Sequence, residues 1–305
     1  MQIGNVEVPN QFALAPMAAV NCTAFRMLCK ENGAGLIYTQ RFDTGRINEK
    51  SSGEIKKFLN IHESEHPVAV QIIGDNAVAL ADAAKRVESF ADIIDLNLGC
   101  GDEEFAAQGS GAALLKGLDK VEEIVNAVVT SVRIPVTAKI RIGVDSQHIN
   151  GVTIAQSLER AGIAAIAVHG RTIEQKYSGK VNWTIMKQIK EKISVPVIAN
   201  GDIKSYDEGL DMLKKTGCDI VMVGREAKHR PWVFNPDKQR LNNEGVCREI
   251  LRFLDLYEKH ESRSSAREAG EHVFWMLRDF RTKKNTREFM NMESIAMIRE
   301  ALRAL

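Results

Sequence analysis

A lysine in the middle of an apolar stretch is the first residue that indicates chemistry. Lys139 stands among Val136, Ala138 and Ile140. An ammonium group placed in an apolar core must either meet negative charge or give up its proton. We therefore expect Lys139 to face an electron-rich ligand.

Two loops further along the chain have the residues that a phosphate needs. Asn200-Gly201-Asp202 and Gly224-Arg225 each follow a short apolar run. Glycines let backbone N–H groups approach a ligand closely, and the arginine adds a fixed positive charge. The first loop alone could be a turn with a helix cap, but the pairing of both favours a phosphate. FMN would satisfy both demands, with its phosphate on these loops and its electron-rich ring edge against the buried lysine.

Other apolar runs also end in residues that could contact a ligand. These residues are Pro16-Met17, Gln71, Asn97, Cys100, Arg141 and His169. His169 alone could equally be a hydrogen-bonded core histidine, and Arg141 could leave the site for solvent. Their shared position at the ends of the runs favours one common site.

Cysteine usage separates Cys100 from the other cysteines. The chain has five cysteines, an odd number without a close CxxC pair, which argues against a disulfide framework or a zinc site. No metal is therefore expected. Cys22, Cys29, Cys218 and Cys247 are expected to be buried as small apolar residues, whereas Cys100 follows Asn97 and a glycine in a loop.

The elements that must position these residues are short apolar runs alternating with segments of helical period. Eight runs are present, at residues 12–17, 36–39, 68–73, 93–98, 136–142, 164–169, 197–200 and 220–224. Repeated right-handed βαβ units close into an α/β fold, the (β/α)8 TIM barrel, whose active site lies at the carboxyl ends of the strands. A doubly wound open sheet is the alternative, but the nearest dinucleotide fingerprint, at residues 109–114, lacks its third glycine.

The pattern changes after Pro236 to helices without strands. We expect a barrel domain over residues 1–236 and a small all-helical domain over 237–305, with helices at 246–260, 266–280 and 287–305. The net charge is only +1, so any nucleic-acid surface must be local. One basic cluster qualifies: Arg278, Arg281, Lys283, Lys284 and Arg287.

The same residues carry a resemblance to a known family. Asp95-Leu96-Asn97-Leu98-Gly99-Cys100, followed by residues 108–115, resembles the signature of tRNA-dihydrouridine synthases, and the motifs around the other strand ends match in order and spacing. The resemblance implies an FMN site formed by Pro16, Met17, Ala18, Gln71, Lys139, His169, Asn200, Gly201, Asp202, Gly224 and Arg225. It further implies that the uracil is contacted by Asn97, Arg141 and Arg171.

The activity implied by the resemblance is the reduction of the C5=C6 bond of specific tRNA uridines, expected in the D-loop. NADPH or NADH would reduce the flavin, the hydride would go to C6, and Cys100 would give a proton to C5. The helical domain would hold tRNA through the basic cluster. Gly101 is a departure, because the family usually has proline after the catalytic cysteine, and a glycine frees the backbone of the loop.

Two other functions remain open from the sequence. One is a flavin barrel that oxidises or reduces a free pyrimidine, of the dihydroorotate or dihydropyrimidine dehydrogenase type. The other is a tRNA-binding barrel without turnover. The N-terminus lacks a signal sequence and no apolar run is long enough to span a membrane, so a cytoplasmic protein is expected, with no membrane or obligate protein partner indicated.

Overall fold

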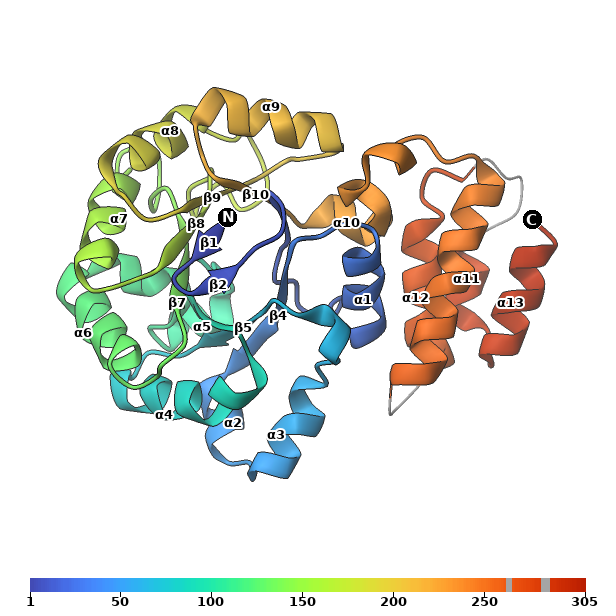
Figure 1. Cartoon of the computed structure of the whole chain (residues 1–305), viewed down its shortest axis with the longest axis horizontal. Helices are drawn as coiled ribbons and strands as arrows, with labels where there is room; N and C mark the ends of the chain where they lie inside the picture. Colours follow the sequence, from blue (N-terminus) through green and yellow to red (C-terminus); the bar gives the residue numbers. More distant parts are fainter. Residues whose placement is uncertain (262–264, 281–285) are drawn as a thin grey trace.

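The computed structural model describes residues 1–261, 265–280 and 286–305 and contains a closed barrel of eight parallel strands (Figure 1). The order around the barrel is β10-β3-β4-β5-β6-β7-β8-β9. The strands are β3 (Phe12–Leu14), β4 (Leu36–Asp43), β5 (Val68–Ile73), β6 (Ile93–Asn97), β7 (Val136–Arg141), β8 (Ala165–His169), β9 (Val197–Asn200) and β10 (Ile220–Val223). Each expected run forms one strand, so the predicted (β/α)8 barrel is confirmed.

Two strand ends differ from the prediction by more than one residue. β3 stops at Leu14 instead of residue 17, because Ala15 makes one last bond to Val223 and Pro16 has no N–H to continue the ladder. β4 continues to Asp43 instead of ending at residue 39, with a register irregularity between Tyr38 and Arg41. The polar residues that made this strand look short extend it toward the barrel mouth.

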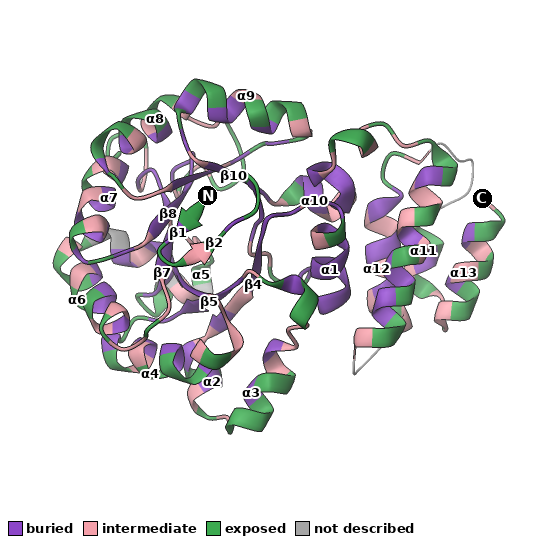
Figure 2. Cartoon of the chain, viewed as in Figure 1, coloured by how far each residue is buried: buried purple, intermediate pink, exposed green. Residues whose placement is uncertain are grey.

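Helices surround the barrel and bury one face each (Figure 2). The helices that follow successive strands are α1 (Thr23–Glu31), α2 (Thr44–Asn48), α3 (Ser52–Leu59), α4 (Ala77–Val87), α5 (Glu103–Ala107), α6 (Leu118–Val129), α7 (Gly151–Arg160), α8 (Trp183–Lys192), α9 (Tyr206–Thr216) and α10 (Arg225–His229). Short 3-10 turns lie at η1 (Glu63–Glu65), η2 (Glu88–Phe90), η3 (Gly111–Lys116), η4 (Pro231–Phe234) and η5 (Pro236–Lys238). In α6, the buried residues Val121, Ile124, Val125 and Val128 recur at helical spacing.

A two-stranded hairpin that the sequence did not reveal covers the amino ends of the barrel strands. It consists of β1 (Gln2–Ile3) and β2 (Val6–Glu7), paired antiparallel. Ile3 and Val8 pack in the cluster that fills the barrel interior. The hairpin leaves the carboxyl ends of the strands as the accessible mouth.

Three α-helices follow the barrel and lie to one side of it, next to α1 (Figure 1). They are α11 (Asn243–His260), α12 (Ala266–Met276) and α13 (Ile295–Arg303), with a 3-10 turn, η6 (Thr286–Asn291), before the last. Contacts between α1 and α11 include an ion pair from Arg252 to Glu31. Within the described residues, no helix is long and apolar enough to cross a membrane.

The predicted helix over residues 287–305 is wrong, because the structure has η6 and then a separate α13. The η6 turn crosses α12 at Gly270, where a Cβ atom would lie 2.0 Å from the carbonyl oxygen of Phe289. The chain then restarts a helix at Ser294, whose side chain accepts a bond from the Met297 N–H. The second predicted helix ends at Met276 instead of residue 280, before a turn in which Arg278 and Asp279 form ion pairs.

Candidate active site

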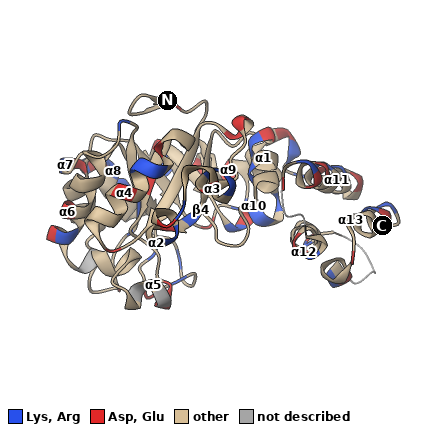
Figure 3. Cartoon of the chain, turned by 90° about the horizontal axis from the view of Figure 1, so that it is seen from below, with Lys and Arg blue, Asp and Glu red and all other residues tan. Residues whose placement is uncertain are grey.

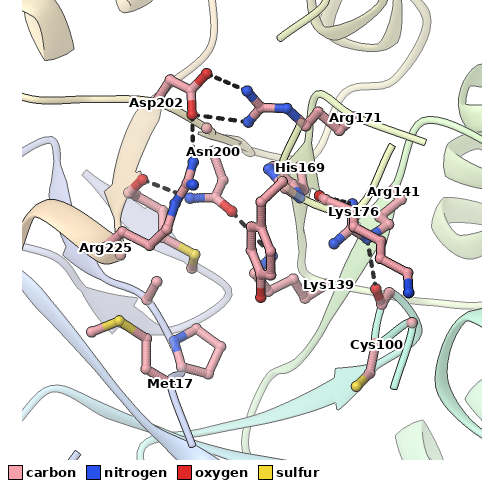
Figure 4. A pocket seen from close by; sticks show the side chains of 18 of the residues that line it. Met17, Cys100, Lys139, Arg141, His169, Arg171, Lys176, Asn200, Asp202 and Arg225 are labelled. Atoms are coloured by element: carbon pink, nitrogen blue, oxygen red, sulfur yellow. Dashed lines mark hydrogen bonds and ion pairs between the residues drawn. The ribbon is translucent and has the colours of Figure 1, made fainter. Parts of the chain in front are cut away.

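A cavity of about 940 Å³ opens at the carboxyl ends of the barrel strands. This volume is near the upper end of the range of about 300–1,000 Å³ that is usual for sites of small ligands. Its lining brings together most of the residues predicted from the sequence: Pro16, Met17, Asn97, Cys100, Lys139, Arg141, His169, Arg171, Asn200, Gly201, Asp202, Gly224 and Arg225. Figure 4 shows the labelled side chains around one space, among them Met17, Cys100, Lys139, His169, Asn200, Asp202 and Arg225.

Lys139 extends from β7 into this cavity. Its Nζ donates to the Asn200 Oδ1 at 3.2 Å, and the Asn200 amide is itself fixed by donating to the Met222 carbonyl at 2.8 Å. Burial, assisted by the nearby Arg141, lowers the pKa of Lys139 to about 8. At neutral pH the Lys139 amino group is thus mainly an ammonium, hydrogen-bonded to the neutral amide of Asn200. This environment favours an anionic ligand.

One corner of the cavity joins three charged side chains. The Asp202 carboxylate accepts bonds from Arg171, with Nη1 to Oδ1 at 2.9 Å, and from Arg225, with Nη2 to Oδ1 at 2.5 Å. The hydrogen bond from Arg171 is the main reason why the pKa of Asp202 is lowered. Arg171 is buried, with 3% of its side chain exposed, whereas 55% of the Arg225 side chain is exposed. Arg225 is therefore the cation of this corner that can reach a ligand.

The two arginines predicted to contact the substrate are both engaged by the protein. Arg141 donates to the carbonyl oxygens of Gly99, Thr172 and Lys176, at 2.9 to 3.0 Å. Arg171 donates, besides its bonds to Asp202, to the carbonyl of Ser178 at 2.8 Å. Both line the cavity, but these bonds also make them anchors of the loops that form its wall.

The loop that carries Cys100 is held in place by backbone bonds. The Asn97 Oδ1 accepts from the N–H groups of both Gly99 (3.2 Å) and Cys100 (2.9 Å), and the Cys100 carbonyl accepts from Ala112 at 2.9 Å. These bonds, together with the one from Arg141 to Gly99, fix the loop without a proline after the cysteine. The freedom expected from Gly101 is therefore offset by its neighbours.

Asp95, a buried acid that was not predicted to belong to the site, supports the loop that carries Cys100. The Asp95 carboxylate accepts from Gln71 Nε2 at 2.7 Å and from Thr137 Oγ1 at 2.6 Å. The Gln71 Oε1 accepts in turn from the Asn97 Nδ2 at 2.8 Å. A continuous chain of bonds thus runs from Asp95 to the cysteine loop. The sequence did contain a signal for Asp95, because a charged residue inside an apolar strand is the same feature that identified Lys139.

Two predicted cofactor residues are not among the described residues that line the cavity. Gln71 is buried, and its amide is bonded to Asp95 and Asn97. Ala18 is exposed in the segment after β3. Their neighbours Met17 and Asn97 reach the cavity instead.

An exposed aromatic ring at the cavity mouth had no signal in the sequence. Tyr177 is 65% exposed, and its ring lies 5.0 Å from the Arg225 guanidinium and 6.5 Å from the His169 ring. Burial, with Lys139 and three arginines nearby, lowers the pKa of His169 to about 2. His169 is therefore a neutral imidazole in this site.

The basic cluster predicted to hold nucleic acid is only partly within the described residues. Arg278 lines the cavity rim and donates to the Glu226 Oε1 at 2.9 Å, so part of its charge is already compensated. Arg287 lies in η6. Arg281, Lys283 and Lys284 lie outside the described residues.

Asp95 gives the site a testable pH dependence of stability. Burial raises the pKa of Asp95 to about 6, so folding favours its protonated form. This contribution to the free energy of unfolding is complete below the unfolded pKa of about 4 and is lost as the pH rises through about 6. We expect the stability of the wild type relative to Asp95→Asn to fall by about 3 kcal/mol over this window, since one pKa unit is worth about 1.4 kcal/mol. Urea unfolding of both proteins across this pH range measures it.

Asp211→Asn on α9 serves as the matched control, because it also removes one carboxylate, from a half-buried side chain that pairs with Lys215 at the surface. It should keep the wild-type pH profile. Parallel profiles for the wild type and Asp95→Asn would show that Asp95 does not titrate in this window.

The chain is similar to known proteins over most of its length. The family model described as Dihydrouridine synthase (Dus) matches residues 13–302. The tRNA-dihydrouridine synthase B of Pseudomonas aeruginosa is 38% identical over 307 residues, which cover 93% of this chain and 91% of that protein. The tRNA-dihydrouridine synthase B of Vibrio vulnificus is 37% identical over 315 residues, with 99% and 97% covered.

Two solved structures share the fold. Histamine dehydrogenase from Rhizobium sp. 4-9 superposes with a TM-score of 0.62 at 14% identity, covering 84% of this chain and 50% of that one, so the chain spans half of its length. The old yellow enzyme homologue from Zymomonas mobilis gives a TM-score of 0.56 at 12% identity, covering 76% and 89%. At these identities the likeness concerns the barrel architecture alone.

Proposed function

The chain belongs to the dihydrouridine synthase family, and we propose that it reduces the C5=C6 bond of uridines in tRNA, in the D-loop, using FMN and either NADPH or NADH. The observation that carries this proposal is the pairing of a half-buried ammonium, Lys139, with a loop thiol, Cys100, in one cavity. The first suits an electron-rich ring, and the second suits a substrate that must be protonated.

The residues of the cavity fit a flavin mononucleotide. The Lys139 ammonium is bonded to an amide rather than to a carboxylate, which leaves its charge for an anionic ring edge. Gly201 has a φ of +138°, and a Cβ there would lie 2.8 Å from Val181, so only glycine fits beside Asp202. The exposed Arg225 adds the cation for a phosphate. Pro16, Met17, His169, Asn200 and Gly224 would complete the contacts.

When bound, the flavin supplies a hydride for C6 of the uracil ring. The protein must supply the rest of the chemistry. The C4 carbonyl of uracil draws electrons from C5=C6, so charge develops toward C5 as the hydride arrives, and the Cys100 thiol donates a proton to that carbon. Asn97 holds the Cys100 backbone and thereby the direction of the thiol.

The neutral His169 and the charged Lys139 have separate tasks in this proposal. Lys139 stabilises negative charge on the reduced ring. His169 has no charge of its own to add, and its buried imidazole can take part through hydrogen bonds. Arg141 and Arg171 keep the loops of the wall in place and so shape the space for the base.

A uridine in folded tRNA must leave its stack to reach this cavity, at a cost of a few kcal/mol that contacts elsewhere must offset. Figure 3 shows acidic and basic residues interspersed along the ribbon of the barrel and the C-terminal helices in that view, so we assign the contacts to a local cluster. We propose that residues 237–305 hold the tRNA backbone through Arg278, Arg281, Lys283, Lys284 and Arg287, and that residues 1–236 form the catalytic unit. With tRNA as the substrate, we propose a cytoplasmic location.

The experiment that tests the function follows the reoxidation of the reduced protein. The flavin-loaded protein is reduced anaerobically with NADPH and mixed with an unmodified tRNA transcript, with uracil or with orotate. We expect reoxidation by tRNA and the appearance of dihydrouridine in it. Equal reoxidation by a free pyrimidine would instead indicate a dehydrogenase of small substrates, and tRNA binding without reoxidation would indicate a barrel that has lost turnover.

A further inference from the structure

A thiol, an imidazole and a carboxylate meet where the amino end of α1 reaches α12, away from the cavity of the active site. Cys22 is the N-cap residue of α1, while Glu268 and His272 lie on α12. The contact is made at the amino end of α1, where the Phe25 ring lies 5.6 Å from the His272 ring between centroids. In the part of the chain that the structure describes, this is the one group of three or more such side chains with metal-ligand spacing.

The distances agree with ligation of a small cation. The Cys22 Sγ lies 3.6 Å from the His272 Nε2, and the ligand atoms of the three residues all lie within 4.8 Å of one another. In a tetrahedral zinc site, with Zn–S near 2.3 Å and Zn–N near 2.0 Å, neighbouring ligand atoms are separated by about 3.5 Å. The thiol and the imidazole are therefore already at the separation that one shared ion requires.

His272 is suited to such a role by its surroundings. It is fully buried among aromatic rings, with Phe253 at 4.9 Å and Trp275 at 5.0 Å between centroids. The ring atom that faces the Cys22 sulfur is Nε2. Nδ1 has no hydrogen-bond partner among the described residues and would carry the ring proton when Nε2 binds a cation. Burial lowers the pKa of His272 to about 3, so the imidazole is neutral and keeps a lone pair for a metal.

Charges of both signs lie near the Cys22 sulfur. Glu261 and Glu268 act on it as negative charges and Arg26 acts on it as a positive one. Glu261 is engaged by the Ala24 N–H at 3.0 Å and by Asn60 at 3.1 Å. Glu268 accepts one bond, from the Tyr257 hydroxyl at 2.8 Å, and remains exposed to solvent.

We propose that Cys22, Glu268 and His272 form a binding site for a divalent cation of the Zn²⁺ class, with a water molecule as the fourth ligand. The ligands are the Cys22 Sγ as thiolate, one Glu268 oxygen and the His272 Nε2. The thiol proton is released to solvent when the sulfur–metal bond forms. The ion would tie the first barrel helix to the C-terminal helices.

The sequence pattern could not show this site. The cysteine is separated from the other two ligands by more than two hundred residues, and no CxxC pair is involved. The remaining signal, Glu268 and His272 at i and i+4 on one helix face, is common in ordinary helices. The prediction that Cys22 is simply a buried apolar residue did not include the contact with His272.

The test uses Co²⁺ as the probe, on untagged, flavin-loaded full chain. We expect one Co²⁺ per chain, with visible d–d bands at wavelengths beyond the flavin absorption, release of one proton and displacement of the bands by Zn²⁺. Zn²⁺ should also raise the Tm, because a ligand bound only by the folded state stabilises it. Glu268→Gln should weaken Co²⁺ binding by about tenfold or more, the scale on which metal sites respond to altered ligation.

Matched cysteine variants show which cysteine binds the Co²⁺ that gives the d–d bands. Cys22→Ser should lose the bands, whereas Cys100→Ala and Cys247→Ser should keep them. The proposal is overturned if the wild type, with its circular dichroism intact, shows no bands at stoichiometric Co²⁺, since the 3.6 Å contact is then only a thiol–imidazole hydrogen bond. Bands that persist in Cys22→Ser would overturn it equally.

Discussion

Replacing Cys100 by alanine is expected to slow dihydrouridine formation by about 100-fold or more, the usual scale for loss of a general acid. Flavin binding and reduction by NADPH should be unchanged, because Cys100 contributes its proton only to the substrate. The loop should stay in place, since its bonds to Asn97 and Ala112 use backbone atoms. Rapid mixing of the reduced variant with a tRNA transcript measures the step.

The matched control is Cys247→Ala, which removes a half-buried thiol from α11. Its turnover should equal that of the wild type. If Cys100→Ala also turned over at the wild-type rate, another group would have to protonate C5.

Replacing Lys139 by methionine is expected to slow reduction of the flavin by NADPH about 100-fold or more, comparable to the removal of one preorganised charge from an active site. Methionine fills a similar volume in the barrel wall but has no charge, so the anionic reduced ring loses its counterion. The reduction potential of the bound flavin should become more negative as a result. Stopped-flow mixing with NADPH measures the rate of flavin reduction, and a redox titration measures the reduction potential.

Lys187→Met on α8 is the control for this substitution, because the Lys187 side chain is exposed and pairs with Glu191 at the surface. It should leave both the rate and the potential unchanged. A normal potential in Lys139→Met would place the ammonium away from the ring and remove the main reason for proposing FMN in this cavity.

The barrel could be predicted because its strands are continuous apolar runs, which parallel strands covered on both faces require. Val68–Ile73 and Val197–Asn200 form strands with the predicted bounds. The N-terminal hairpin could not be predicted, since its strands have two residues each. The break in the last helix depends on the close approach of Phe289 to Gly270, a tertiary contact that local pattern does not contain.

The location of the site could be predicted, because the barrel brings the carboxyl ends of all its strands to one mouth. Lys139 and Asn200 lie on different strands, yet both were expected at one mouth and are bonded there. The partners of a side chain were not predictable. Arg141 and Arg171 look like substrate contacts in the sequence, but only coordinates reveal the carbonyl groups that engage them. Tyr177 lacks any periodicity that would mark it.

The Asn97 Oδ1 accepts hydrogen bonds from two successive N–H groups, those of Gly99 and Cys100, and this pair of bonds bears on which substitutions the site tolerates. The reactive sulfur takes its aim from Asn97, a residue rooted in the barrel wall, and not from stiffness of the loop itself. The glycine at position 101 can therefore stand where proline is usual without loss of the sulfur's position, while a change at Asn97 would misdirect the sulfur even in an otherwise identical loop.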